Sequence, residues 1–69
     1  MEAKDSNGTT LAEGDSVKLT KDLKVKGSSA TLKRGTVVKN IRLTDDAEEI
    51  EGRVDRTVMV LKTMYLQKV

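Results

Sequence analysis

The sequence predicts a small all-β domain, a strongly bent barrel of five or six short strands. Short stretches alternate apolar and polar residues with a period of two, which is the pattern of half-buried strands. Turn signals rich in Gly, Asp and Asn separate these stretches. No segment of about ten residues or more places apolar side chains at helical spacing, so helices are not expected.

The first residues differ from the rest because they are polar and have no periodicity. Residues 1–10 are predicted to be a flexible N-terminal segment, with a turn at Asp5-Ser6-Asn7-Gly8. The folded domain is then expected to span residues 11–69 and to begin with Leu11 and a turn around Gly14.

Two strands are predicted next, at residues 17–20 and 21–26, each with one apolar face. The inward-facing residues are Val17, Leu19, Leu23 and Val25. The outward-facing residues of the second strand are Asp22, Lys24 and Lys26. The small residues Gly27-Ser28-Ser29 are expected to end it in a turn.

Residues 36–43 are predicted to form one central strand, after residues 30–32 and a turn at Gly35. Its apolar residues are Val37, Ile41 and Leu43 in phase, with Val38 out of phase. Apolar side chains on both faces are typical of a strongly bent strand in a small barrel.

The last third is predicted to close the domain. The expected elements are a turn at 44–47, a weak strand at 50–54, a tight connection at 55–56, the strongest strand at 57–61, a short helical turn at 62–64 and a closing strand at 65–69. So many strands in so short a chain favour a loose SH3-like barrel, with a five-stranded OB-type barrel as the alternative.

Composition excludes several kinds of chemistry. The 69 residues include no Cys and no His, which removes disulfides, thiol chemistry, zinc-finger sites and Cys–His or Ser–His catalytic pairs. We expect no enzyme activity and no cofactor. No apolar run approaches the roughly 20 residues of a membrane span. A soluble, cytoplasmic protein is therefore predicted, without contact to a membrane.

Charge is strongly segregated along the chain. Residues 17–42 contain eight basic residues and one acid, Asp22, which gives this segment a net charge of +7. Residues 43–55 contain six acids and one base, Arg53, which gives −5. The domain is therefore dipolar, although its overall net charge is only +2.

The basic segment is the main functional candidate. The residues predicted to face an anion or a nucleic acid are Lys18, Lys24, Lys26, Gly27, Ser28, Ser29, Lys33, Arg34, Lys39 and Arg42. Lysine and arginine would contact phosphates, and Gly27-Ser28-Ser29 would offer backbone N–H groups as an anion nest. The alternatives are a solvated strand face that protects sheet edges and a simple turn.

Two further groups have a structural interpretation that we favour. The acids Asp45, Asp46, Glu48, Glu49 and Glu51 lack EF-hand spacing, so a solvated acidic loop is expected rather than a site for Ca²⁺, Mg²⁺ or acid–base catalysis. Met59, Met64 and Tyr65 are expected in the core, with an exposed seam for a partner as the alternative.

Several motifs resemble one known family. They are Gly14-Asp15-Ser16-Val17, the run from Lys21 to Ser29 ("KDLKVKGSS") and the run from Lys33 to Leu43. These residues are similar to the C-terminal domain of the bacterial PhnA family, also called YjdM or alkylphosphonate utilisation operon protein. The resemblance covers nearly the whole chain. It implies an SH3-like barrel, but no activity, because the family is named for its gene neighbourhood.

The chain departs from that family in two respects. Many members carry an N-terminal zinc ribbon with paired Cys-x-x-Cys motifs, so this cysteine-free chain resembles the shorter, zinc-free members. Residues 45–59 are also more acidic than the resemblance implies. Three hypotheses remain: a binding module whose basic face contacts nucleic acid or an acidic protein, a phosphonate-related carrier or enzyme accessory, and a structural subunit. As a structural subunit it would complete a homodimer through a sheet edge. The expected oligomeric state is a monomer or a weak homodimer.

Overall fold

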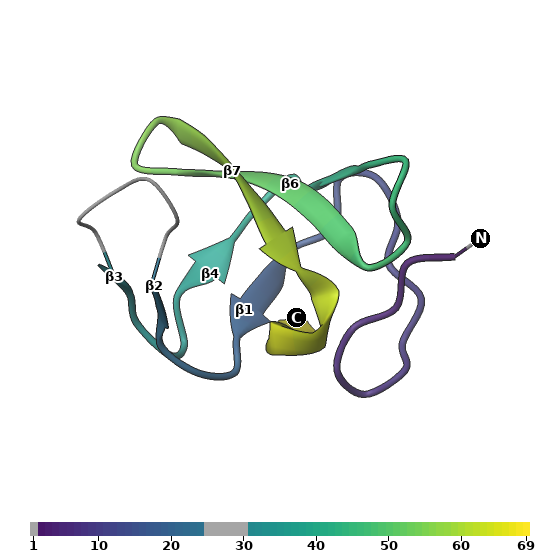
Figure 1. Cartoon of the computed structure of the whole chain (residues 1–69), viewed down its shortest axis with the longest axis horizontal. Helices are drawn as coiled ribbons and strands as arrows, with labels where there is room; N and C mark the ends of the chain where they lie inside the picture. The colour runs from purple at the N-terminus through teal and green to yellow at the C-terminus, as the bar shows by residue number, and fades with distance from the viewer. Residues whose placement is uncertain (1, 25–30) are drawn as a thin grey trace.

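The computed structural model is built almost entirely from short strands (Figure 1), and it describes residues 2–24 and 31–69. The strands are β1 (Val17–Leu19), β2 (Leu23–Lys24), β3 (Thr31–Leu32), β4 (Val37–Val38), β5 (Arg42–Leu43), β6 (Glu49–Val54), β7 (Thr57–Lys62) and β8 (Leu66–Lys68). A single 3-10 turn, η1 (Thr63–Tyr65), precedes β8. The all-β prediction is confirmed, and the short helical turn lies within one residue of its expected place.

The strands form three small antiparallel sheets. Their strand orders are β4-β1-β8, β2-β3 and β5-β6-β7. Strand β1 is central in the first sheet, where Val17 lies opposite both Val38 and Lys68. The sheets are open, and the described strands do not close into a barrel. The SH3-like barrel therefore stays a prediction.

One core lies between the sheets and draws a residue from nearly every part of the chain. Its buried members are Ala3, Leu11, Val17, Leu19, Leu32, Val38, Ile41, Ile50, Leu61 and Leu66. Leu23, Val54 and Met59 are partly buried and pack against it. The inward direction predicted for Val17, Leu19 and Leu23 is confirmed, whereas Val25 lies outside the described residues.

Strand β6 crosses β4 at close range within the core. Gly52 of β6 is buried, and Val38 of β4 is fully buried against it. A Cβ atom at Gly52 would overlap Cγ1 of Val38, far inside van der Waals contact. Glycine is therefore required here so that two strands from different sheets can approach each other closely.

The predicted long strand at 36–43 is wrong in one respect, since it is two strands in two sheets. Asn40 has a φ of 57° and breaks the extended chain between β4 and β5. This break also changes the phase of the side chains. Val38 and Ile41 are both fully buried, whereas Val37 is 47% exposed and Leu43 is 38% exposed.

The N-terminal residues, predicted as a flexible segment, lie against the sheets as a loop. In Figure 1 this loop is at the opposite side of the view from β2 and β3. Lys4 and Thr10 form an antiparallel bridge, and Ala3 is part of the core. The Ser6 N–H donates to the Leu66 carbonyl at 2.8 Å, which joins the loop to β8.

Candidate functional site

The predicted basic residues occupy three different regions of the structure. Lys18 lies on β1, while Lys24 lies on β2 and Lys33 and Arg34 follow β3 in a turn. Lys39 and Arg42 flank the Asn40 bend. All of these side chains belong to exposed residues. Lys26, Gly27, Ser28 and Ser29 lie outside the described residues, and so the anion-nest hypothesis does too.

One groove gathers positive charge. We call it the basic groove, and its lining residues are Lys39, Asn40, Arg42, Glu51, Gly52, Arg53, Arg56 and Val58. It is an open hollow of about 610 Å³. Two of the predicted basic residues, Lys39 and Arg42, therefore meet two arginines that the sequence analysis did not select.

The β5-β6-β7 sheet places four of the groove side chains, of which Arg42 and Arg53 are basic. Arg42 of β5 lies opposite Glu51 of β6, and Arg53 of β6 lies opposite Val58 of β7. Glu51 and Arg53 are two residues apart on one strand, so their side chains point to the same face of the sheet. That face is the outer one, because the intervening Gly52 is turned toward Val38 and the core.

The fourth cation comes from the β6–β7 turn. Val54 lies opposite Thr57, so Asp55 and Arg56 alone connect the two strands. Both have positive φ, 50° and 68°, which is the geometry of a type I′ hairpin turn. The turn brings Arg56 to the end of the groove formed by the outer face of β6.

The Asn40 bend is held by the turn before β1. The Gly14 N–H donates to the Ile41 carbonyl at 2.8 Å, and the Ile41 N–H donates to the Asp15 carbonyl at 3.0 Å. Oε2 of Glu13 accepts from the Leu43 N–H at 2.9 Å. These contacts fix the backbone after Asn40, and the pairing of β4 with β1 fixes the backbone before it. Lys39 and Arg42 are therefore held on either side of the bend.

The groove cations are not neutralised by ion pairs. Across residues 2–24 and 31–69 the one salt bridge joins Nζ of Lys68 to Oδ2 of Asp15 at 3.3 Å, away from the groove. Glu51 is the one acid among the groove residues, against four bases. The groove thus carries a concentrated positive potential that is available to an anionic ligand.

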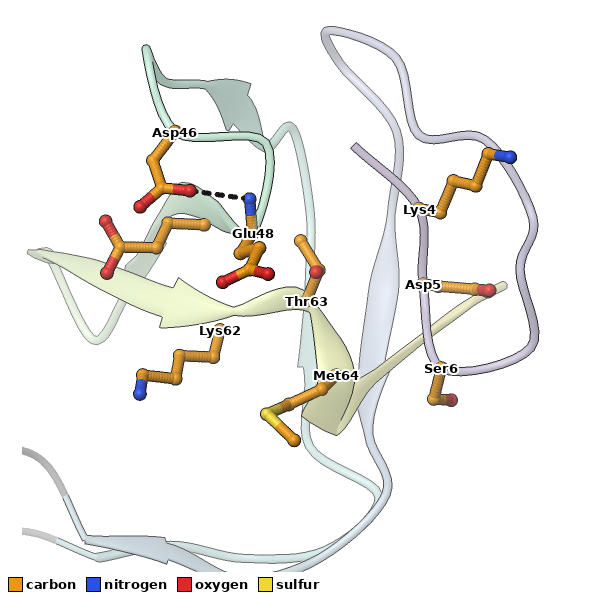
Figure 2. Close-up of a pocket in the computed structure, with 9 residues that line it drawn as sticks. Lys4, Asp5, Ser6, Asp46, Glu48, Lys62, Thr63 and Met64 are labelled. Atoms are coloured by element: carbon orange, nitrogen blue, oxygen red, sulfur yellow. Dashed lines mark hydrogen bonds between the residues drawn. The ribbon is translucent and has the colours of Figure 1, made fainter. Parts of the chain in front are cut away.

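A second hollow, of about 460 Å³, lies between the N-terminal loop, the acidic turn before β6 and the end of β7 (Figure 2). It is lined by Lys4, Asp5, Ser6, Asp46, Glu48, Glu49, Lys62, Thr63 and Met64. The Oδ1 atom of Asp46 accepts from the Glu48 N–H at 2.8 Å, which shapes the acidic turn. Among the described residues, no group of three or more acidic side chains is placed to hold a metal ion.

Asp5, beside this hollow, connects both ends of the chain. Its Oδ1 accepts from the Asn7 and Thr9 N–H groups at 2.9 and 2.8 Å, and its Oδ2 accepts from the Lys68 N–H at 2.7 Å. Burial raises the pKa of the Asp5 carboxyl, but these backbone donors outweigh it and hold the pKa below 3.8. Asp5 is therefore a structural carboxylate.

The residues near the C-terminal end behave differently from one another. Met59 is partly buried against the core, as predicted. Met64 is 60% exposed, so its predicted place in the core is wrong, because η1 turns it outward toward the second hollow (Figure 2). Tyr65 is half-buried, and Nζ of Lys21 lies 4.6 Å from its ring centroid. The only aromatic ring is thus engaged outside the basic groove.

Residues 2–24 and 31–69 contain no helix with the length and apolar character needed to cross a membrane.

Comparison with known proteins identifies the family. The chain is 53% identical over 66 residues to Protein YjdM of Escherichia coli K12. The aligned region covers 94% of this chain and 60% of that protein. It is 54% identical over 65 residues to the YjdM homolog of Haemophilus influenzae, covering 94% of this chain and 51% of the homolog. It is 49% identical over 65 residues to YjdM of Streptococcus mutans, covering 93% and 59%.

The chain therefore spans between half and three fifths of the length of these relatives. Its residues 3–69 match the model of the YjdM family, described as the PhnA domain. The matched range includes the N-terminal loop and all eight strands. The chain belongs to the YjdM family, as a PhnA domain.

Proposed function

We propose that this PhnA domain is a non-enzymatic binding module that holds the phosphate backbone of a nucleic acid in its basic groove. The observation that carries the proposal is the convergence of Lys39, Arg42, Arg53 and Arg56 around one hollow that contains a single acid. Cations that converge from separate elements, with no ion pair among the described residues, match the charge of a phosphate backbone.

The remaining properties expected of such a module are also proposals. An SH3-like arrangement is supported by three short antiparallel sheets packed on one core, with a close crossing at Gly52. A cytoplasmic location is consistent with the need to reach nucleic acid. Lys24, Lys33 and Arg34, near the β2–β3 hairpin, would add positive charge at long range without lining the groove.

The experiment that tests the proposal measures binding to a fluorescently labelled nucleic acid over a series of salt concentrations. If all four cations contact phosphates, the logarithm of the association constant should fall with the logarithm of salt with a slope near −3.6, since each contact contributes about −0.9. Between about 50 and 200 mM salt the affinity should then fall roughly 150-fold.

A matched pair of double variants locates the site. Lys39→Gln with Arg42→Gln removes two groove charges, and we expect the slope to weaken by about 1.8. Lys18→Gln with Lys33→Gln removes two charges outside the groove and should leave the slope nearly unchanged. No binding by the native protein at low salt, or equal losses in the two double variants, would refute the groove as the site. Salt-sensitive binding to an acidic protein alone would show that the partner is a protein instead.

A phosphonate-related carrier is the second candidate, because a hollow of about 610 Å³ also has the size of a small-molecule site. Guanidinium groups bind phosphonates as they bind phosphates. Isothermal titration with methylphosphonate distinguishes the two functions. Saturable heat that disappears in Arg42→Gln supports the carrier, and the absence of heat removes it.

A further inference from the structure

The hairpin that ends the basic groove contains a residue in an unfavourable conformation. In the described chain, the residues other than glycine with positive φ are Asn40, Asp55 and Arg56. Two of the three, Asn40 and Arg56, line the basic groove. Left-handed backbone conformations at residues with bulky side chains tend to occur at functional sites.

Arg56 is the costly member of this set. Asparagine and aspartate adopt the left-handed conformation more readily than other residues, and Asp is a usual first residue of a type I′ turn. The second position of that turn ordinarily holds glycine, and here Arg56 occupies it with a φ of 68°. The turn therefore has an arginine where glycine would form it more easily.

The location of Arg56 suits an arginine better than a glycine. As the second residue of a two-residue turn, it is exposed to solvent at the end of β6 and β7. It lines the same hollow as Arg53 and Arg42, so three arginines border one space. A glycine at position 56 would keep the hairpin and remove one of the four groove cations.

The composition of the groove also indicates the form of the nucleic acid. Binding of single strands usually depends on aromatic side chains on which bases stack. The groove residues include no aromatic side chain, and the one tyrosine of the sequence is beside Lys21 instead. Double strands are held by arginine and lysine contacts to the backbone, and arginine enters narrow minor grooves.

We infer that the basic groove binds double-stranded nucleic acid and that Arg56, at the tip of the β6–β7 hairpin, contacts its backbone directly. This inference rests on the proposed function and assigns it a ligand form and a residue.

The decisive variant is Arg56→Gly, because its effects on folding and on binding have opposite signs. Relief of the left-handed strain, partly offset by the greater freedom of glycine in the unfolded chain, should raise the thermal midpoint by about 2–4 °C. Loss of one phosphate contact should reduce the salt slope by about 0.9 and weaken duplex binding about 8-fold near 0.1 M salt. A purely structural Arg56 would change the midpoint and leave the salt slope as it was.

Arg56→Lys is the matched control, since it keeps both the charge and a side chain at the left-handed position. We expect its thermal midpoint and its salt slope to stay near those of the native protein. The ligands are a DNA duplex, an RNA duplex and a single DNA strand, all of one sequence. Both duplexes should bind more tightly than the single strand. The duplex with the higher affinity shows whether the bound backbone is DNA or RNA.

The outcomes separate this inference from the function on which it rests. If a single strand binds as tightly as the duplexes, or if Arg56→Gly binds duplex like the native protein, the inference is wrong while the groove remains a nucleic-acid site. If the native protein binds none of the three probes at low salt, both are wrong.

Discussion

Substitution of Gly52 by alanine tests whether the close crossing of β6 and β4 organises the core. Gly52 has no positive φ, so alanine meets no backbone strain at this position. Without a clash, Gly→Ala would be expected to stabilise the protein by about 0.4–1 kcal/mol, because alanine lowers the conformational entropy of the unfolded chain. The new methyl group would instead overlap Cγ1 of Val38, which is fully buried.

The size of the effect follows from how little Val38 can move. Valine is stiff about its first side-chain torsion, and Val38 lies opposite Val17 in the β4-β1 pair. Overpacking of such a site costs about 1–3 kcal/mol. A domain of this length has a free energy of unfolding of roughly 3–10 kcal/mol, so the variant should fold but be markedly less stable. The expected fall in thermal midpoint is about 5–20 °C.

The assay is thermal and urea unfolding followed by circular dichroism, with Val38→Ala and the Gly52→Ala/Val38→Ala pair as a double-mutant cycle. Val38→Ala alone leaves a cavity and should also destabilise the protein. In the pair, Val38→Ala makes room for the new methyl group at position 52, and that methyl group fills part of the cavity. The combined loss should therefore be smaller than the sum by about 0.5–3 kcal/mol. A Gly52→Ala protein as stable as the native one, or additive losses, would refute the crossing described here.

Two further predictions concern single side chains. Asp5→Asn should reduce the free energy of unfolding at neutral pH by about 1–3 kcal/mol, because an amide cannot accept from all three N–H donors. The pKa of Asp5 is lowered in the folded state, so its carboxylate contributes fully to stability above pH 3.8, the unfolded value. This contribution is lost as the pH falls through the lower pKa of the folded state. The free energies of unfolding of the native protein and Asp5→Asn should therefore approach each other in acid. Tyr65→Leu should cost about 0.5–1 kcal/mol by loss of the Lys21 contact, and the same substitution in a Lys21→Gln background should cost less. Equal costs in the two backgrounds would show that the ring and the ammonium group do not interact.

The strands were predictable from sequence because their signal is local. Alternation at Val17 and Leu19, and the β-branched run of β7, require no knowledge of distant residues. The bend at Asn40 was not predictable in this way. Asparagine permits a left-handed conformation but does not impose it, and the hydrogen bonds between the Gly14–Asp15 turn and Ile41 are formed only in the folded protein.

The candidate site was half predictable for a related reason. Lys39 and Arg42 stand out because they belong to the basic segment, whereas Arg53 and Arg56 are hidden beside acids in sequence. Their convergence depends on the register of β5, β6 and β7, which pairs Arg42 with Glu51 and Arg53 with Val58. The signal that was present was Arg56 itself, a bulky residue in a turn where glycine is usual.

The contacts of Asp5 have a consequence for how the domain unfolds. The Asp5 side chain near the start of the chain accepts a hydrogen bond from the backbone N–H of Lys68 near its end. This contact joins the two ends of the chain, and the strands lie between them in sequence. Many small domains achieve such a closure with a disulfide, which this cysteine-free sequence does not have. These contacts are hydrogen bonds to a carboxylate, so reducing agents leave them intact and protonation of one side chain weakens them. Both ends of the chain should therefore come loose together, as one step.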